Sequence, residues 1–330
     1  MRITNKLVYI PYQQNLESIQ NRRFKEQIRL STGESIVNMA DAPEKLNNVK
    51  RMTALINRNE QYFRNIDKAM GELRTIDDQL QSMTDQVTEI RQVVIDATHV
   101  GHKGATETLA QYVKGILEDM ITKSNSEYNG QYIFSGTKTT PDSLDKTPEA
   151  QNDLPFELVE GTPSADNPSG LQIVFKGNNK SREILKDDKS TEVINTKAED
   201  VFGAGSTELF ERMIDLYNIM AYDENGNKRG DTPLTREEVG KMSDLQKDIV
   251  MVFERLNKAA AQNGAKLNRL ESIQLQLQEE NTRLEEIRSI DRDTDVTKAV
   301  INLQKEDTAL NYSLSIGARL LPQSLFDFLR

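Results

Sequence analysis

An unbroken seven-residue repeat between residues 66 and 97 constrains the fold of this chain more than any other feature. Apolar residues recur at every seventh position, and a second apolar row follows three residues after the first. The two rows are Ile66, Leu73, Leu80, Val87 and Val94, and Ala69, Ile76, Met83, Ile90 and Ala97. A repeat of this period keeps one stripe of a helix facing a partner helix. We therefore predict a long helix here, although the same stripe also suits the core of an ordinary helix bundle.

The C-terminal half carries similar rows, so the partner helix can come from the same chain. Leu270, Leu277 and Leu284 stand seven residues apart, and Glu280 interrupts the accompanying row. After the charged residues 291–293 the pattern resumes with Val296, Leu303 and Leu310. The predicted coiled-coil seam of the rod consists of Ile66, Leu73, Ile76, Leu80, Met83, Val87, Ile90, Val94, Leu270, Leu277 and Leu284.

The middle of the chain differs in composition. Five of the nine prolines lie within residues 141–168. Two short alternating runs, 171–176 and 181–186, flank Gly177-Asn178-Asn179, which predicts a β-hairpin. The predicted fold class is mainly α with a small β-rich insertion, an elongated rod of N- and C-terminal helices packed as a coiled-coil bundle.

Three domains are expected from this organisation. Residues 1–40 with 290–330 would form a terminal helical assembly domain. Residues 41–137 with 203–289 would form the helical rod, and residues 138–202 would form the β-rich insertion.

Charge and composition argue against several classes of protein. The formal net charge is −10, which disfavours binding to nucleic acid or to an anionic membrane surface. The chain has no cysteine, so disulfides, thiolate nucleophiles and cysteine metal sites are excluded. No apolar run approaches the roughly 20 residues that span a bilayer. Since the first residues also lack the apolar stretch of a secretory signal, we expect no general secretory export.

Candidate catalytic and ligand sites are weak. His99 and His102 stand three residues apart, but no nearby acidic residue completes a known metal pattern. Residues 223–234 open like a calcium loop, yet Lys228 and Leu234 occupy the positions of the required Gly and Glu. The tripeptide 229–231, Arg-Gly-Asp, lies in the same polar loop and is interpreted as a chance match. We therefore predict no enzyme activity, no cofactor and no metal.

Three segments resemble the flagellin family. Arg29-Leu30-Ser31-Thr32-Gly33-Glu34-Ser35-Ile36, followed by Asp41-Ala42-Pro43, resembles its N-terminal signature. Residues 293–299, 303–304, 309–310 and 325–330 are similar to its terminal helix and apolar tail. Residues 128–138, Tyr-Asn-Gly-Gln-Tyr-Ile-Phe-Ser-Gly-Thr-Lys, resemble the branch of the family that joins the flagellar hook to the filament.

Local chemistry is compatible with this resemblance. Gly33 can adopt a positive φ angle where two helices join. Asp41 can cap a helix that has Pro43 at an early position. Pro11 fits less well, because a proline inside the first helix predicts a kink or a delayed helix start.

The resemblance implies a structural subunit of the bacterial flagellum, located outside the cell after export by the flagellar type III apparatus. It implies self-assembly into a ring or tube between another hook-associated protein and flagellin, and a cytosolic export chaperone at the C-terminal helix. Assembly contacts would involve Ile3, Leu7, Ile10, Leu30, Val300, Leu303, Leu310, Leu314 and Leu321.

Two alternatives stay open. One is the filament flagellin itself, because Pro322-Gln323 resembles the end of filament subunits. The other, from a different class, is an intracellular coiled-coil scaffold without a flagellar role. The scaffold would explain the repeats and the acidity, but it would not explain the three flagellin-like segments together.

Overall fold

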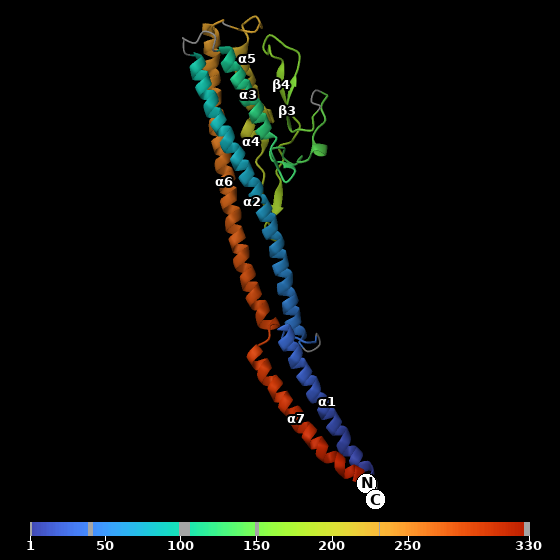
Figure 1. Ribbon diagram of the computed structural model, residues 1–330. Helices are drawn as coiled ribbons and strands as arrows, with labels where there is room; N and C mark the ends of the chain where they lie inside the picture. The colour runs from blue at the N-terminus through green and yellow to red at the C-terminus, as the bar shows by residue number, and fades with distance from the viewer. Residues whose placement is uncertain (1, 39–41, 99–105, 149–151, 231, 327–330) are drawn as a thin grey trace. The chain divides into compact units, whose positions relative to one another are not determined.

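The computed structural model describes residues 2–38, 42–98, 106–148, 152–230 and 232–326 (Figure 1). Contacts divide the chain into two compact units, residues 1–60 with 277–330 and residues 61–276. Long helices dominate and short antiparallel strand pairs are inserted between them, which confirms the predicted mainly α fold with a small β-rich insertion. The three-domain division expected from the sequence remains a prediction.

The first unit contains α1 (Arg2–Thr32) and α7 (Val296–Phe326), which lie side by side (Figure 1). It also contains the start of α2 (Pro43–Thr98) and the end of α6 (Arg236–Arg292). Met52 and Ile56 of α2 form a small apolar core with Leu284 of α6.

The sequence predicted a kink or a delayed helix start at Pro11. The delayed start is wrong, because α1 begins at Arg2 and continues through Pro11, and the kink stays a prediction. Proline removes one helical hydrogen bond and strains the preceding turn. Tyr12, directly after the proline, donates a hydrogen bond of 3.0 Å from its hydroxyl to the Ser313 carbonyl on α7. Packing against α7 therefore reaches the residue directly after the proline, where the local sequence favours a break.

The second unit is a helical bundle of α2, α3 (Thr106–Ser124), α5 (Glu208–Ala221) and α6. Val87 of α2, Met213 of α5 and Val252 of α6 line one small apolar void between these helices. The buried side chain of Asn263 on α6 donates a hydrogen bond of 2.7 Å to the Leu73 carbonyl on α2. All eleven side chains predicted for the rod seam are buried: Ile66, Leu73, Ile76, Leu80, Met83, Val87, Ile90, Val94, Leu270, Leu277 and Leu284.

Between α3 and α5 the described residues include three separate antiparallel strand pairs and the short helix α4 (Ala198–Phe202), and the second and third pairs lie in the predicted insertion 138–202. The pairs are β1 (Glu127–Tyr128) with β2 (Gln131–Tyr132), β3 (Phe156–Glu160) with β4 (Leu171–Phe175), and β5 (Glu183–Leu185) with β6 (Thr191–Val193).

The predicted hairpin between residues 171–176 and 181–186 is therefore wrong. Phe175 pairs across the β3–β4 ladder with Phe156, and their rings stack with centroids 4.7 Å apart. Lys176 is buried and forms an ion pair of 2.7 Å with Glu157. These contacts outweigh the local turn signal at residues 177–179. The run 171–175 therefore pairs with the preceding strand β3 and not with residues 181–186.

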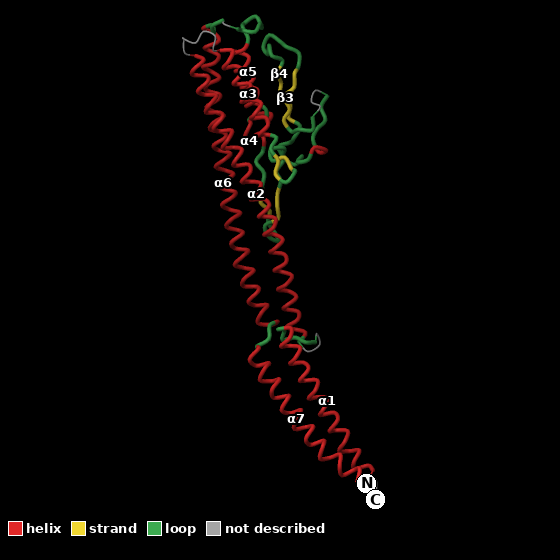
Figure 2. Tube along the Cα trace, viewed as in Figure 1, coloured by secondary structure: helices red, strands yellow, loops and turns green. Residues whose placement is uncertain are grey.

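An aromatic cluster attaches the insertion to the helices of the second unit, where β3 and β4 contact α3 and α5 (Figure 2). The ring of Phe156 lies 4.9 Å from that of Phe202 on α4 and 5.6 Å from that of Phe210 on α5. Phe134 packs edge-on against Phe202 at 5.4 Å. Since these four rings are fully buried, Phe156 joins the strand pair to the helical core.

We expect Phe156→Ala to destabilise the second unit by about 3–5 kcal/mol, because it removes a fully buried ring and leaves a cavity. Hydrogen exchange of the β3–β4 amides would measure this loss. The matched control is Leu154→Ala, whose side chain is exposed and should change stability by less than about 0.5 kcal/mol. Equal effects of the two substitutions would contradict the role of the cluster.

Candidate assembly interface

The turn after α1 is hydrogen-bonded to the break between α6 and α7. The Thr294 amide donates to the Gly33 carbonyl at 2.8 Å, and the Ser35 amide donates to the Arg292 carbonyl at 2.7 Å. The Ser35 hydroxyl donates to the Asp291 carbonyl at 2.9 Å. We call residues 33–35 and 291–294 the joint. It connects the N-terminal and C-terminal segments in which the sequence resembles flagellins.

Gly33 permits this arrangement because its φ angle is +73°, which glycine adopts without steric cost. Its amide donates to the Arg29 carbonyl at 2.9 Å and so closes the end of α1. The Arg29 side chain donates to the Ser35 carbonyl at 3.1 Å and pairs with Glu26 at 2.7 Å. The positive φ angle predicted for Gly33 is therefore present.

Charged groups at the joint stabilise one another. Asp293 accepts hydrogen bonds from the Ser289 hydroxyl at 2.6 Å and from Arg292 at 2.8 Å. These bonds, the one from Ser289 first, hold the pKa of the Asp293 carboxyl below its usual range. The hydrogen bond between Arg292 and Asp293 also raises the pKa of the Arg292 guanidinium. Asn48 of α2 donates to the Asp291 carboxylate at 3.3 Å, so α2 is also tied to the joint.

Beyond the joint, α1 and α7 pack through one row of residues each, which we call the inner rows. Their members alternate at spacings of four and three residues, as in a coiled coil. The inner rows are Tyr12, Leu16, Ile19, Arg23, Glu26 and Leu30 on α1, and Ala299, Leu303, Glu306, Leu310, Ser313 and Gly317 on α7.

The inner rows mix polar and apolar contacts. Glu306 pairs with Arg22 at 3.0 Å, and Asp307 pairs with Arg23. A Cβ atom on Gly317 would lie 2.1 Å from the Tyr12 hydroxyl, so glycine at this position leaves room for the tyrosine. Because two of the six α1 residues, Arg23 and Glu26, are charged, no continuous apolar stripe in the sequence marks the inner row of α1. Only the spacing of four and three residues marks it.

The residues predicted for assembly contacts fall on different faces. Leu30, Leu303 and Leu310 lie on the inner rows and are partly buried. Ile10, Val300 and Leu314 are 48%, 38% and 49% exposed. The side chains of Ile3, Leu7 and Leu321 lie outside the described part of the structure. The assembly role of all nine residues remains a prediction.

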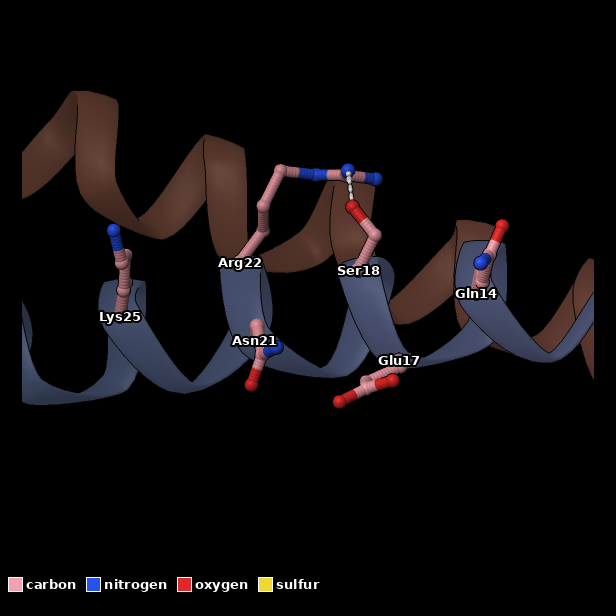
Figure 3. Close-up of a pocket in the computed structure, with 6 residues that line it drawn as sticks. All are labelled: Gln14, Glu17, Ser18, Asn21, Arg22 and Lys25. Atoms are coloured by element: carbon pink, nitrogen blue, oxygen red, sulfur yellow. Dashed lines mark hydrogen bonds between the residues drawn. The ribbon is translucent and has the colours of Figure 1, made fainter. Parts of the chain in front are cut away.

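A shallow polar depression runs along the side of α1 (Figure 3). Its lining residues are Gln14, Glu17, Ser18, Asn21, Arg22 and Lys25. Arg22 reaches across to the Ser18 hydroxyl, to which it donates a hydrogen bond of 2.8 Å.

Within the described ranges, no group of three His, Cys, Asp or Glu could hold a metal ion. His99 and His102 lie outside those ranges.

The other sequence motifs have structural roles inside the second unit. Within the segment 128–138, Tyr132, Ile133, Phe134 and Ser135 are buried and contribute to the core. A Cβ atom on Gly71 of α2 would lie 2.1 Å from the Tyr128 hydroxyl, so α2 leaves room for this residue. The segment thus holds the insertion on the helices.

Arg229, the first residue of the Arg-Gly-Asp tripeptide, is 3% exposed and therefore not available to a partner. It is ion-paired with Glu238 in the first turn of α6 and donates to the Ile219 carbonyl at 2.9 Å. Burial alone would raise the pKa of the Glu238 carboxyl, but hydrogen bonds from Arg229 and the Thr235 amide hold it below its usual range. Asp231 lies outside the described residues.

The calcium-like loop closes on itself. The Asp223 carboxylate accepts hydrogen bonds of 2.9 Å from the amides of Asn225 and Asn227. These bonds, the one from Asn227 first, lower the pKa of the Asp223 carboxyl. The loop is thus an Asx-type turn.

No helix in the described ranges is both long and apolar enough to cross a membrane.

Comparison with known proteins identifies the type of fold. Residues 3–139 match the model of the bacterial flagellin N-terminal helical region. Comparison with curated proteins gives no match. Among solved structures, a proposed flagellar hook-associated protein of Vibrio parahaemolyticus is 15% identical, with a TM-score of 0.58 over 77% of this chain and 98% of that chain.

Two further structures are similar. Flagellar hook-associated protein-3 of Legionella pneumophila is 13% identical, with a TM-score of 0.55 over 73% of this chain and 97% of that chain. FlgL of Xanthomonas campestris is 11% identical, with a TM-score of 0.54 over 73% of this chain and 99% of that chain.

Residues 3–139 therefore carry a flagellin-type N-terminal helical region. The fold of the chain is that of flagellar hook-associated proteins, and it is shared in particular with hook-associated protein-3, FlgL. The resemblance found in the sequence is confirmed at these two levels.

We expect Gly33→Ala to weaken the joint, because alanine at a positive φ angle costs about 1–2 kcal/mol. Hydrogen exchange at the Ser35 and Thr294 amides should become roughly 5–30-fold faster.

Gly115→Ala in α3 is the matched control, since an added Cβ atom meets no neighbour at either glycine. Gly115 has no positive φ angle, so its substitution should leave exchange at the joint unchanged. Unchanged exchange in Gly33→Ala would show that the turn does not limit opening of the joint.

Proposed function

We propose that this chain is a structural subunit of the bacterial flagellum that forms the junction between hook and filament, and that it is not an enzyme. The joint carries this proposal, because it brings together the N-terminal and C-terminal segments that resemble flagellins. Further support comes from the flagellin-type region at residues 3–139 and from the shared fold with hook-associated protein-3. The subunit would act outside the cell after export by the flagellar type III apparatus.

In this function α1 and α7 carry the contacts between subunits. They pair within one chain through the inner rows, and several large apolar side chains stay exposed around the pair. Isolated helices are marginal in water unless an apolar face is packed. Copies of the chain would therefore assemble into a ring or tube, with another hook-associated protein on the hook side and flagellin on the filament side.

The filament flagellin itself is the second candidate. It is favoured by the match of residues 3–139 to the flagellin N-terminal helical region. The internal segment 128–138 favours the junction subunit instead, since its sequence resembles the junction branch of the family.

Deleting the gene for this chain separates the two candidates. For a junction subunit we expect hooks to persist while flagellin is shed into the medium, because filaments would lack their attachment point. Electron microscopy of cells and immunoblots of the medium would measure this. A missing filament without shed flagellin would instead identify the filament subunit, and intact filaments would refute both candidates.

We further propose that a cytosolic export chaperone binds α7 before assembly. Val300, Leu314 and Ile316 are large apolar residues of α7 that are 38%, 49% and 56% exposed, so water contacts them in the single chain. We expect deletion of residues 290–330 to abolish chaperone binding in titration calorimetry. Phe253→Ser on α6 is the control, because it removes a comparably exposed apolar residue elsewhere and should leave binding unchanged. Equal affinity of the deletion variant and the full chain would refute this site.

A further inference from the structure

Helix α1 carries a second row of residues at coiled-coil spacing, on the face opposite its inner row. This outer row of α1 is Ile10, Gln14, Glu17, Asn21 and Phe24. It is displaced by two residues from the inner row, which is about 200° around a helix with 3.6 residues per turn. All five residues are exposed, Ile10 by 48% and Phe24 by 60%.

Helix α7 has a corresponding outer row of Ile301, Lys305, Thr308, Tyr312 and Ile316. All five residues are exposed, and the three apolar ones are exposed by 59%, 69% and 56%. Covering exposed isoleucine and tyrosine side chains with another surface removes apolar area from water and lowers the free energy. Both helices of the pair therefore present an unoccupied face that has the spacing of a helix–helix contact.

The two outer rows match each other in pattern and charge. Each is apolar at both ends and polar in the middle, and at 1.5 Å per residue the α1 row spans about 21 Å and the α7 row about 22–23 Å. Glu17 stands at the centre of the α1 row, within the polar depression of Figure 3. Lys305 stands in the polar part of the α7 row. An α1 row facing another α1 row would instead place Glu17 against Glu17, which is unfavourable.

Within one chain the two outer rows cannot meet, because α1 and α7 face each other through their inner rows. We propose that the outer row of α1 in one copy packs on the outer row of α7 in a second copy. This rests on the proposed self-assembly of the chain and identifies the contact surfaces. The contact joins two different surfaces, so when two copies pair, one keeps a free outer row of α7 and the other keeps a free outer row of α1. Such a contact builds a ring or a helical tube rather than a closed pair.

The chain has no cysteine, so single cysteines can report the contact between copies. Two full-length variants, each with one cysteine, are mixed and oxidised under conditions where the chain associates. For antiparallel rows we expect disulfide-linked dimers between Phe24→Cys and Ile301→Cys. For parallel rows we expect them between Ile10→Cys and Ile301→Cys.

Val296→Cys replaces Ile301→Cys as the control, because Val296 is equally exposed at 59% but lies off the outer row of α7. It should give only background dimer with either α1 variant. The proposal is overturned if neither mixture exceeds this background, or if the strongest dimers join two α1 or two α7 cysteines.

A charge exchange tests the same contact independently. We expect Glu17→Lys and Lys305→Glu each to lower association of the full chain at least about tenfold in sedimentation, and the double variant to recover it. No recovery in the double variant would refute the pairing of the two rows. If the unmodified chain does not associate at all, the proposed assembly function itself fails. If it associates but the cysteine and charge variants have no effect, only this interface fails.

Discussion

Hydrogen bonding between two distant turns is the constraint on which the first unit depends. Where α1 ends and where α6 gives way to α7, backbone groups lose their helical partners and must be satisfied elsewhere. The turns solve this for each other, through Gly33 with Thr294 and Ser35 with Arg292. Neither turn can form these hydrogen bonds without the other. The end of α1 and the start of α7 are therefore held next to each other.

The joint also removes an ambiguity that is inherent in seven-residue repeats. Two helices with such repeats can slide by seven residues and still match apolar positions, so other contacts must select the register. Within the first unit the joint makes this selection, and the ion pair of Arg22 with Glu306 agrees with it. Within the second unit, buried Asn263 bonds to the Leu73 carbonyl and acts in the same sense.

The sequence predicted the parts of the fold that depend on apolar periodicity. The seam from Ile66 to Val94 was visible because every seventh position is apolar, and burial follows that pattern. The inner row of α1 was not visible, because the charged residues Arg23 and Glu26 occupy seam positions, and the partner of Arg23 is Asp307 at the far end of the sequence. The contacts of α1 with α7 could therefore be placed only when both helices were seen together.

Strand pairing was lost for a related reason. The turn at residues 177–179 is a genuine local signal, but the partner of β4 lies in a proline-rich segment without a clear strand pattern. Lys176, the residue after β4, is buried and pairs with Glu157 on β3, a contact that no sequence pattern marked. Likewise, Arg229 stood in a polar loop, yet its guanidinium is among the most buried charges of the described chain.

The distance along the chain between paired residues bears on the order in which the protein can fold. Tyr12 and Ser313 are 301 residues apart, so the pair of α1 and α7 closes a loop of nearly the whole chain. Contacts of such separation form late, after local helices and hairpins exist. During synthesis, or during passage lengthwise through a narrow channel, one end of the chain emerges before the other. The end that emerges first cannot form the α1–α7 pair until the second end has followed. Until then α1 has no α7 on which to pack, and the unit 61–276 can already be complete.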